Sequence, residues 1–305
     1  MDSVKKMIVR RVYPSGYCLG VINAIKITRK TIEEHPDEPV FIIGMIVHNR
    51  YVVEAFRNLG AVTLDDRDLS KEAMIDRISK GVVIFTAHGI SDHIRQKALD
   101  KGLTVVDASC KFVLNNRDLI RKHLDEGYVI LYIGKKKHPE AEAILSISDD
   151  IHLITGKKDL DSLCIGNERI LVTNQTTMSI YDTRELIDAI KVKYPQAAVS
   201  EDICDATRSR QEAVMKLTDT DTLIIVGDPR SNNTAQLANI GRNCGISRII
   251  RVEQASDLKD VTFSPDERIA VTAGASTPSY LTDSVIGYLK EKDERYLKTD
   301  ISRIL

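Results

Sequence analysis

The sequence predicts an α/β protein made of three similar units, each a parallel sheet with crossover helices. Three cysteines, Cys18, Cys110 and Cys204, are nearly equally spaced, with intervals of 92 and 94 residues. Each cysteine follows a short extended segment and precedes a helical pattern, and a buried strand then follows in each third of the chain. A recurring interval indicates a structural repeat, and alternating strands and helices favour parallel sheets.

The segments on either side of these cysteines are the first landmark of each unit. Strands are predicted before the cysteines, over residues 7–12, 104–107 and 198–203. Helices are predicted after them: one through Val21, Ile22, Ile25 and Ile32, one over 112–126 and one over 207–217.

A buried strand that ends in glycine is the second landmark. These strands are predicted over 40–43, 128–133 and 222–226, and the glycines follow the cysteines by 26, 24 and 23 residues. Four residues past each glycine comes a polar side chain that is expected to begin a helix: His48, His138 and Ser231.

A strand that ends in threonine is the third landmark. These strands are predicted over 82–86, 169–173 and 268–272, followed by helices over 92–101, 179–194 and 278–294. Ligands of parallel sheets bind beyond the carboxyl ends of the strands. We therefore expect each unit to direct one cysteine, one residue four past the glycine and one threonine loop toward a common cavity.

Composition excludes several classes of partner. Lys plus Arg total 43 and Asp plus Glu total 44, so no basic excess favours nucleic acid or an anionic membrane. No run of 18 apolar residues would span a bilayer, and residues 1–6 contain no apolar signal segment. We expect a cytoplasmic protein that binds neither nucleic acid nor membrane.

The cysteines are typical of a metal site that the fold must assemble. An odd number of cysteines and the absence of a Cys-x-x-Cys pair argue against a disulfide framework or a zinc ribbon. Three thiolates are one short of a closed site, so a [4Fe–4S] cluster on Cys18, Cys110 and Cys204 would keep one iron open to substrate. The alternative is that the thiols are small buried hydrophobes. Cys164 and Cys244 break the spacing and are interpreted as structural.

Hydroxyl, amide and imidazole side chains predominate around the predicted thiol site. Such donors suit a phosphate or diphosphate, although N-capping of helices favours the same residue types. Glu140 is the exception: it complements a helix dipole beside Pro139, or it supplies the protons that a reduction consumes. The set is His48, His88, His138, Glu140, Gln175, Thr176, Thr177, Ser231, Asn233 and Ser276.

Eight segments, in order from about residue 7 to 290, resemble the 4-hydroxy-3-methylbut-2-enyl diphosphate reductase family. They are Ser-Gly-Tyr-Cys18-Leu-Gly-Val, Val-His48-Asn-Arg-Tyr-Val-Val, Thr-Ala-His88-Gly-Ile-Ser, Asp-Ala-Ser-Cys110, His138-Pro-Glu140, Gln175-Thr-Thr, Asp-Ile-Cys204-Asp-Ala-Thr and Thr-Ala-Gly-Ala-Ser276.

The resemblance implies a trefoil of three pseudo-threefold-related α/β units around a central, oxygen-sensitive [4Fe–4S] cluster. The units would be residues 19–110, residues 111–200, and residues 1–18 together with 201–305. The implied reaction is a two-electron, two-proton reduction of the allylic diphosphate to isopentenyl and dimethylallyl diphosphate and water. A ferredoxin or flavodoxin is the implied electron donor.

The resemblance also assigns roles to residues. Cys18, Cys110 and Cys204 would ligate the cluster. His138, Glu140 and Thr176 would surround the substrate hydroxyl, with Glu140 feeding protons. The diphosphate would be held by His48, His88, Ser231, Asn233 and Ser276, with Asn232 as a further candidate.

The chain departs from the family pattern at three places. Asn232 stands where the family usually has serine, which puts its role as a diphosphate ligand in doubt. Lys111 replaces the proline that commonly follows the second cysteine, and Lys136 and Lys137 replace small residues before His138. These lysines change the charge near the expected pocket.

Two other functions remain open at this point. One is another three-cysteine iron–sulfur enzyme such as quinolinate synthase, against which the His-Pro-Glu and Ser-x-Asn segments speak. The other is a non-catalytic metal-binding sensor, which would not need an open iron beside a proton donor.

Overall fold

The computed structural model describes residues 7–66, 68–166 and 169–305. The chain forms two compact units. The first unit holds His48–Ala55, Asp205–Leu305 and the described part of Met1–Leu19, and the second holds Gly20–Val47 and Phe56–Cys204. The N-terminal residues 1–6, where the sequence predicts no signal segment, lie outside the described residues. No helix in the described ranges has the length and apolar character needed to cross a bilayer.

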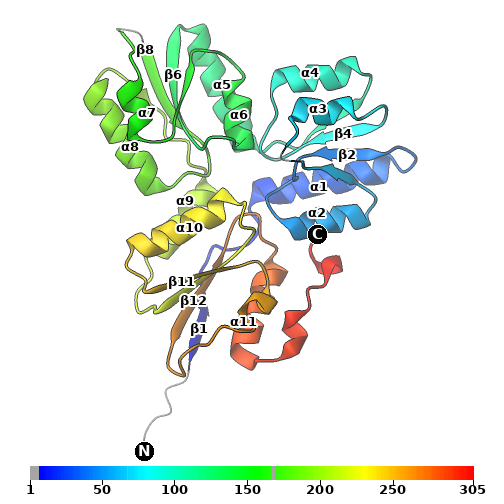
Figure 1. Ribbon diagram of the computed structural model, residues 1–305, viewed down its shortest axis with the longest axis vertical. Coiled ribbons are helices and arrows are strands. Elements are labelled where there is room, and N and C mark those ends of the chain that lie inside the picture. Colours follow the sequence, from blue (N-terminus) through cyan, green and yellow to red (C-terminus); the bar gives the residue numbers. More distant parts are fainter. Residues whose placement is uncertain (1–6, 67, 167–168) are drawn as a thin grey trace, which may run out of the picture. The chain divides into compact units, whose positions relative to one another are not determined.

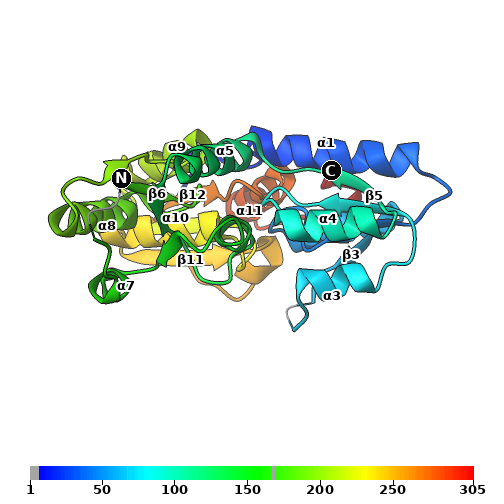
Figure 2. The same cartoon turned by 90° about the horizontal axis from the view of Figure 1, so that it is seen from above.

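The first unit contains one parallel four-stranded sheet. Its strand order is β1 (Ile8–Arg11), β12 (Arg268–Ala273), β10 (Thr222–Val226) and β11 (Arg248–Val252). Figures 1 and 2 show α10 lying alongside β10 and β11. The helices are α9 (Asp205–Met215), α10 (Asn232–Asn243) and α11 (Ser279–Glu291), with short turns η1 (Ala255–Leu258), η2 (Glu294–Leu297) and η3 (Ile301–Arg303).

The second unit contains two parallel four-stranded sheets. One has the order β3 (Val62–Leu64), β2 (Val40–Ile43), β4 (Val82–Phe85), β5 (Thr104–Asp107). The other has the order β7 (Ile151–Ile154), β6 (Tyr128–Ile133), β8 (Arg169–Asn174), β9 (Ala198–Val199).

Helices alternate with these strands along the chain. Figure 2 shows α5 beside β6, the strand that follows it. The helices are α1 (Leu19–Glu34), α3 (Lys71–Asp76), α4 (Asp92–Asp100), α5 (Lys111–Asp125), α6 (Pro139–Leu145), α7 (Lys157–Ser162) and α8 (Ile180–Lys193), together with α2 (Arg50–Asn58), which begins in the first unit.

All three sheets share one strand order. The strand that ends in glycine can be called the first strand of each sheet. Across the sheet, from one edge to the other, the order is then second, first, third and fourth strand. In the sheet of the first unit, the fourth strand is β1, which precedes the other three strands of that sheet in the sequence. The predicted α/β class and its three repeated sheets are therefore confirmed, whereas the predicted unit boundaries at residues 19–110, 111–200 and 1–18 plus 201–305 stay a prediction.

The central strands form because they are continuous apolar runs. The four residues of β4, Val-Val-Ile-Phe, are all buried, as are all five of β10, Thr-Leu-Ile-Ile-Val. A parallel strand covered on both faces requires this composition. Predicted strands and helices other than those corrected below agree with the structure to within two residues at each end.

The strand predicted over 198–203 is shorter than expected. The Ser200 N–H still donates to the Val172 carbonyl at 2.8 Å. The Asp202 N–H instead donates to the side-chain oxygen of Asn174 at 3.0 Å. The regular ladder therefore ends at Val199, because a side chain has replaced the next backbone acceptor.

Two helix predictions also need correction. The helix predicted over 278–294 ends at Glu291, because Lys292 adopts a left-handed conformation with φ of 55°. His48 does not begin α2. The helix begins at Arg50, and Asn49 caps it, because the Asn49 side-chain oxygen accepts the N–H groups of Tyr51 and Val52 at 3.0 and 3.3 Å.

Gly81 lies where the chain approaches itself closely, at the start of the paired strands β2 and β4. A Cβ built there would lie 2.3 Å from the Pro39 carbonyl oxygen, at a φ of +113°. Gly102 has a φ of +73° but open space around it. We expect Gly81→Ala to lower the free energy of unfolding by at least ~3 kcal/mol, and Gly102→Ala by only ~1 kcal/mol. Urea denaturation of both variants measures this, and equal losses would show that backbone conformation alone matters.

Candidate active site

The three spacing-related cysteines are held in the same way by the backbone. Each donates its N–H to a carbonyl in the loop after the third strand of its own sheet. The acceptors are Ala275 for Cys18 at 3.1 Å, Ala87 for Cys110 at 3.0 Å and Thr176 for Cys204 at 3.1 Å. This shared contact places every cysteine directly beside its threonine loop.

The thiols fit the donor chemistry of an iron–sulfur cluster. Cys18, Cys110 and Cys204 are partly buried in the segments that follow β1, β5 and β9, whereas Cys164 and Cys244 are exposed. Thiolates are the ligands that such clusters take, and three of them leave one iron position open. Within the described ranges, no group of three or more His, Cys, Asp or Glu side chains lies close enough together to hold a metal ion.

Several predicted diphosphate residues come together in the first unit. The Ser276 hydroxyl donates to the His48 carbonyl at 2.9 Å. The Asn233 side-chain oxygen accepts the Ala275 N–H at 3.0 Å, which ties α10 to the loop that carries Ser276. Ser231 caps α10, with its hydroxyl accepting the Thr234 N–H at 3.3 Å. The positive end of a helix dipole and a set of neutral donors thus lie in one region.

Asn232 differs from its neighbours. It is the first residue of α10 and is buried. Its side-chain oxygen accepts a hydrogen bond from Gln236, one turn along the helix, at 3.4 Å. This internal contact agrees with the doubt that the sequence raises about Asn232 as a ligand.

Two glycines allow the strand ends of the first unit to approach Thr234. A Cβ at Gly227, whose φ is +157°, would lie 2.4 Å from the Thr234 hydroxyl oxygen, and one at Gly274 would lie 2.2 Å from it. Any other residue would push the ends of β10 and β12 away from the start of α10. The glycine after β10 is therefore required by close packing as well as by backbone conformation.

The predicted catalytic residues come together in the second unit. The Glu140 carboxyl accepts the Thr176 N–H at 2.8 Å and the Thr176 hydroxyl at 3.0 Å. His138 caps α6, and its Nδ1 accepts the Glu140 N–H at 3.2 Å. His88 lies edge-on to His138, with ring centroids 5.8 Å apart.

The His138 contact determines which nitrogen carries its proton. A ring nitrogen that accepts a hydrogen bond cannot itself hold a hydrogen. Neutral His138 therefore carries its proton on Nε2, which leaves that nitrogen as a donor.

Glu140 has the environment of an acid that works near neutral pH. Its side chain is 2 % exposed, and burial raises its pKa from 4.5 to about 7. Hydrogen bonds from Thr176 and Tyr132 lower the pKa, but they do not offset the loss of hydration. Nearby Asp202 raises it further.

Tyr132 is a site residue that the sequence did not reveal. Its hydroxyl donates to the Glu140 carboxyl at 3.4 Å, from the buried strand β6. In sequence it stands in the run Tyr-Val-Ile-Leu-Tyr-Ile, where an aromatic residue indicates core packing. A hydroxyl-bearing side chain two residues before the strand-ending glycine was the only signal.

The lysines before His138 occupy a tight turn. Lys136 and Lys137 are exposed, and Lys137 has a φ of 61°. This left-handed conformation favours glycine, and it costs a lysine about 1 kcal/mol or more. Among the small residues expected here from the family pattern, glycine would remove this strain, because it has no Cβ.

The raised pKa of Glu140 predicts a pH-dependent loss of stability. Between pH 4.5 and about 7 the native carboxyl keeps a proton that the unfolded chain releases. The free energy of unfolding therefore falls as pH rises through this window, by ~3 kcal/mol in total. Glu140→Gln should escape this loss and gain stability relative to wild type between pH 4.5 and 8 in urea denaturation. Glu142→Gln, in the same turn of α6, is the control. A difference between Glu140→Gln and wild type that does not vary with pH would contradict the assignment.

The chain is similar to several known proteins. A family model described as LytB protein matches residues 9–290. A Bacillus cereus (strain AH187) protein named 4-hydroxy-3-methylbut-2-enyl diphosphate reductase is 43 % identical over 309 residues, which cover 98 % of this chain and 97 % of that protein. A Bacillus anthracis protein of the same name gives the same figures.

Two solved structures are also similar. The E-1-hydroxy-2-methyl-but-2-enyl-4-diphosphate reductase from Plasmodium falciparum has a TM-score of 0.85 at 28 % identity, over 95 % of this chain and 90 % of that one. A structure described as (E)-4-hydroxy-3-methyl-but-2-enyl diphosphate reductase has a TM-score of 0.66 at 28 % identity, over 93 % of this chain and 100 % of that one. With a family match across nearly the whole length, the chain belongs to the LytB protein family.

Proposed function

We propose that this chain reduces 4-hydroxy-3-methylbut-2-enyl diphosphate to isopentenyl and dimethylallyl diphosphate. The substrate takes up two electrons and two protons and loses its hydroxyl group as water. The names of the similar proteins support this reaction. The observation that carries it is Glu140, a buried carboxyl with a pKa of about 7 beside two other predicted catalytic residues.

The proposed cofactor is a [4Fe–4S] cluster on Cys18, Cys110 and Cys204. When bound, such a cluster supplies electrons and an open iron that acts as a Lewis acid. The shared backbone contact of the three cysteines and their partial exposure support this ligand set. A ferredoxin or flavodoxin is the proposed electron donor, and the cytoplasm is the proposed location.

The diphosphate is proposed to bind at the start of α10 in the first unit. Ser231, Asn233 and Ser276 supply neutral donors there, and His48 adds an imidazole. His88 is proposed as a further diphosphate ligand. The positive end of the α10 dipole favours the anionic tail.

Glu140 is proposed to deliver protons to the leaving hydroxyl. Its protonated carboxyl donates to Thr176 Oγ1, which is 3.0 Å from Oε2. The Thr176 hydroxyl then donates onward to the substrate oxygen. His138 contributes a second donor through Nε2, because its Nδ1 is occupied by the Glu140 N–H. Both donors stabilise the departing oxygen as it gains negative charge.

Glu140→Gln tests the proton donor. The amide keeps the shape and hydrogen bonding of the carboxyl but does not release a proton readily. We expect the variant to bind cluster and substrate normally and to turn over at least ~100-fold more slowly in an anaerobic assay. Glu142→Gln, a carboxylate on the exposed face of the same helix, is the control. Near-normal turnover by Glu140→Gln would refute its role as the acid.

Single cysteine-to-alanine variants test the ligand set. Cys18→Ala, Cys110→Ala and Cys204→Ala should each lose iron and visible absorption after anaerobic purification, because each removes one of three thiolates. Cys164→Ala and Cys244→Ala should keep both signals. Loss of iron from Cys164→Ala with retention in Cys110→Ala would overturn the assignment made from the repeat.

A further inference from the structure

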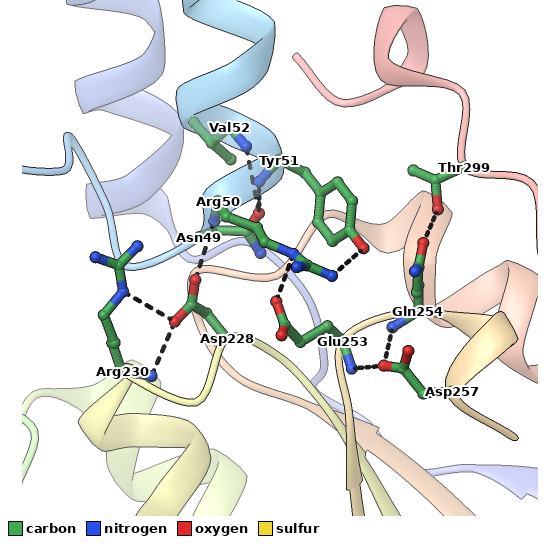
Figure 3. Close-up of polar contacts among 10 residues, drawn as sticks. All are labelled: Asn49, Arg50, Tyr51, Val52, Asp228, Arg230, Glu253, Gln254, Asp257 and Thr299. Carbon is green, nitrogen blue, oxygen red and sulfur yellow. Dashed lines mark hydrogen bonds and ion pairs between the residues drawn. The ribbon is translucent and has the colours of Figure 1, made fainter.

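Within the first unit, a buried carboxylate holds the segment that carries His48 against the loop after β10. Asp228 lies just past β10 and is 3 % exposed. One of its oxygens, Oδ2, accepts the Arg50 N–H at 3.0 Å (Figure 3). Because Arg50 is the first residue of α2, this bond satisfies a helix N–H that has no partner within the helix.

The other oxygen of Asp228 shapes the loop that leads to Ser231. Oδ1 accepts the Arg230 N–H at 2.8 Å, and the Arg230 side chain lies 3.5 Å away through Nε. The Asp228 carbonyl also accepts the Ser231 N–H at 3.0 Å. One residue therefore holds both the start of α2 and the approach to α10.

The Arg50 side chain makes a second, independent link. Its Nε lies 2.7 Å from the Glu253 carboxylate, just past β11, and its Nη2 donates to the Tyr51 hydroxyl at 2.9 Å (Figure 3). The Arg50 side chain is half exposed, so this pair contributes less than the buried contact at Asp228. The Asp228 bond to the Arg50 backbone is thus the stronger constraint on the segment.

We propose that Asp228 is a positioning residue that holds His48 and Ser231 in register as one diphosphate site. His48 is two residues before Arg50, and its carbonyl accepts a hydrogen bond from the Ser276 hydroxyl. Fixing the Arg50 N–H therefore fixes the backbone from which the imidazole projects. This inference rests on the proposed function, because it assumes that these residues bind a diphosphate.

A merely structural role is the alternative, in which Asp228 stabilises α2 without affecting the ligand. The two roles differ in their readouts. A structural role lowers stability and cluster content and leaves the affinity of the folded protein unchanged. A positioning role weakens binding and raises KM while kcat is unchanged, because ground state and transition state lose the same contact.

Arg50 offers a way to delete this single hydrogen bond. Proline is well accepted at the first position of a helix and has no N–H, so Arg50→Pro removes the donor to Asp228. Arg50→Ala loses the same side chain and keeps the N–H. We expect Arg50→Pro to bind inorganic diphosphate and the allylic diphosphate about 10-fold more weakly than Arg50→Ala, as expected for one lost bond to a charged acceptor. Anaerobic calorimetry measures both affinities, and steady-state assays give KM and kcat.

Repeating the pair in a His48→Ala background tests whether the effect passes through His48. The difference between Arg50→Pro and Arg50→Ala should then shrink to nearly nothing. Equal affinities for the two variants in the original background would overturn the proposal, as would a difference that persists without His48. If the unaltered protein binds neither probe, the proposed function fails and the inference fails with it.

Asp228→Asn and Asp257→Asn form a second matched pair. Asp228 uses both oxygens for separate N–H groups, so an asparagine must lose one of them. Asp257 accepts two N–H groups, from Glu253 and Gln254, on the single oxygen Oδ2, which an asparagine retains (Figure 3). We expect weaker diphosphate binding in Asp228→Asn and unchanged binding in Asp257→Asn. Equal affinities in the two would contradict the proposal.

Discussion

The parallel pairing between the third and fourth strands of each sheet determines where the cysteines lie. Phe85 pairs with Asp107 in one sheet, and Val172 with Val199 in another. With this register fixed, the chain beyond the fourth strand runs beside the loop beyond the third, and the cysteine N–H reaches a carbonyl there. A slip of one residue would turn every side chain of the strand to the opposite face. Cysteine placement is therefore a consequence of strand register.

A competition between burial and hydrogen bonding sets the chemistry of Glu140. Two bonds from Thr176 and one from Tyr132 favour the carboxylate, while burial and Asp202 favour the protonated form. Burial is the larger effect, so the pKa lies near 7. An arginine in contact with the carboxyl would have reversed the outcome and produced a permanent anion. Burial thus makes this residue able to give up a proton at neutral pH.

Sequence reasoning succeeded where the signal was local and failed where it came from a distant side chain. The apolar runs of β2, β6 and β10 end at glycines, and their bounds were predicted as observed. β9 ends early because Asn174 replaces a backbone acceptor. Asn49, and not His48, caps α2. Among site residues, the position of Glu140 after a helix-starting proline was informative, but Tyr132 was indistinguishable from core.

The strands that precede the three cysteines differ in how far along the sequence their pairing partners lie. Cys110 follows β5, and Cys204 follows β9, both of which pair with strands shortly before them in sequence. Cys18 follows β1, which pairs with β12, a strand that comes after all strands of the other two sheets in the sequence. Contacts of such long sequence separation form late, because the entropy of closing a long loop opposes them. We therefore expect the bond from the Cys18 N–H to the Ala275 carbonyl to form later in folding than the corresponding bonds of Cys110 and Cys204.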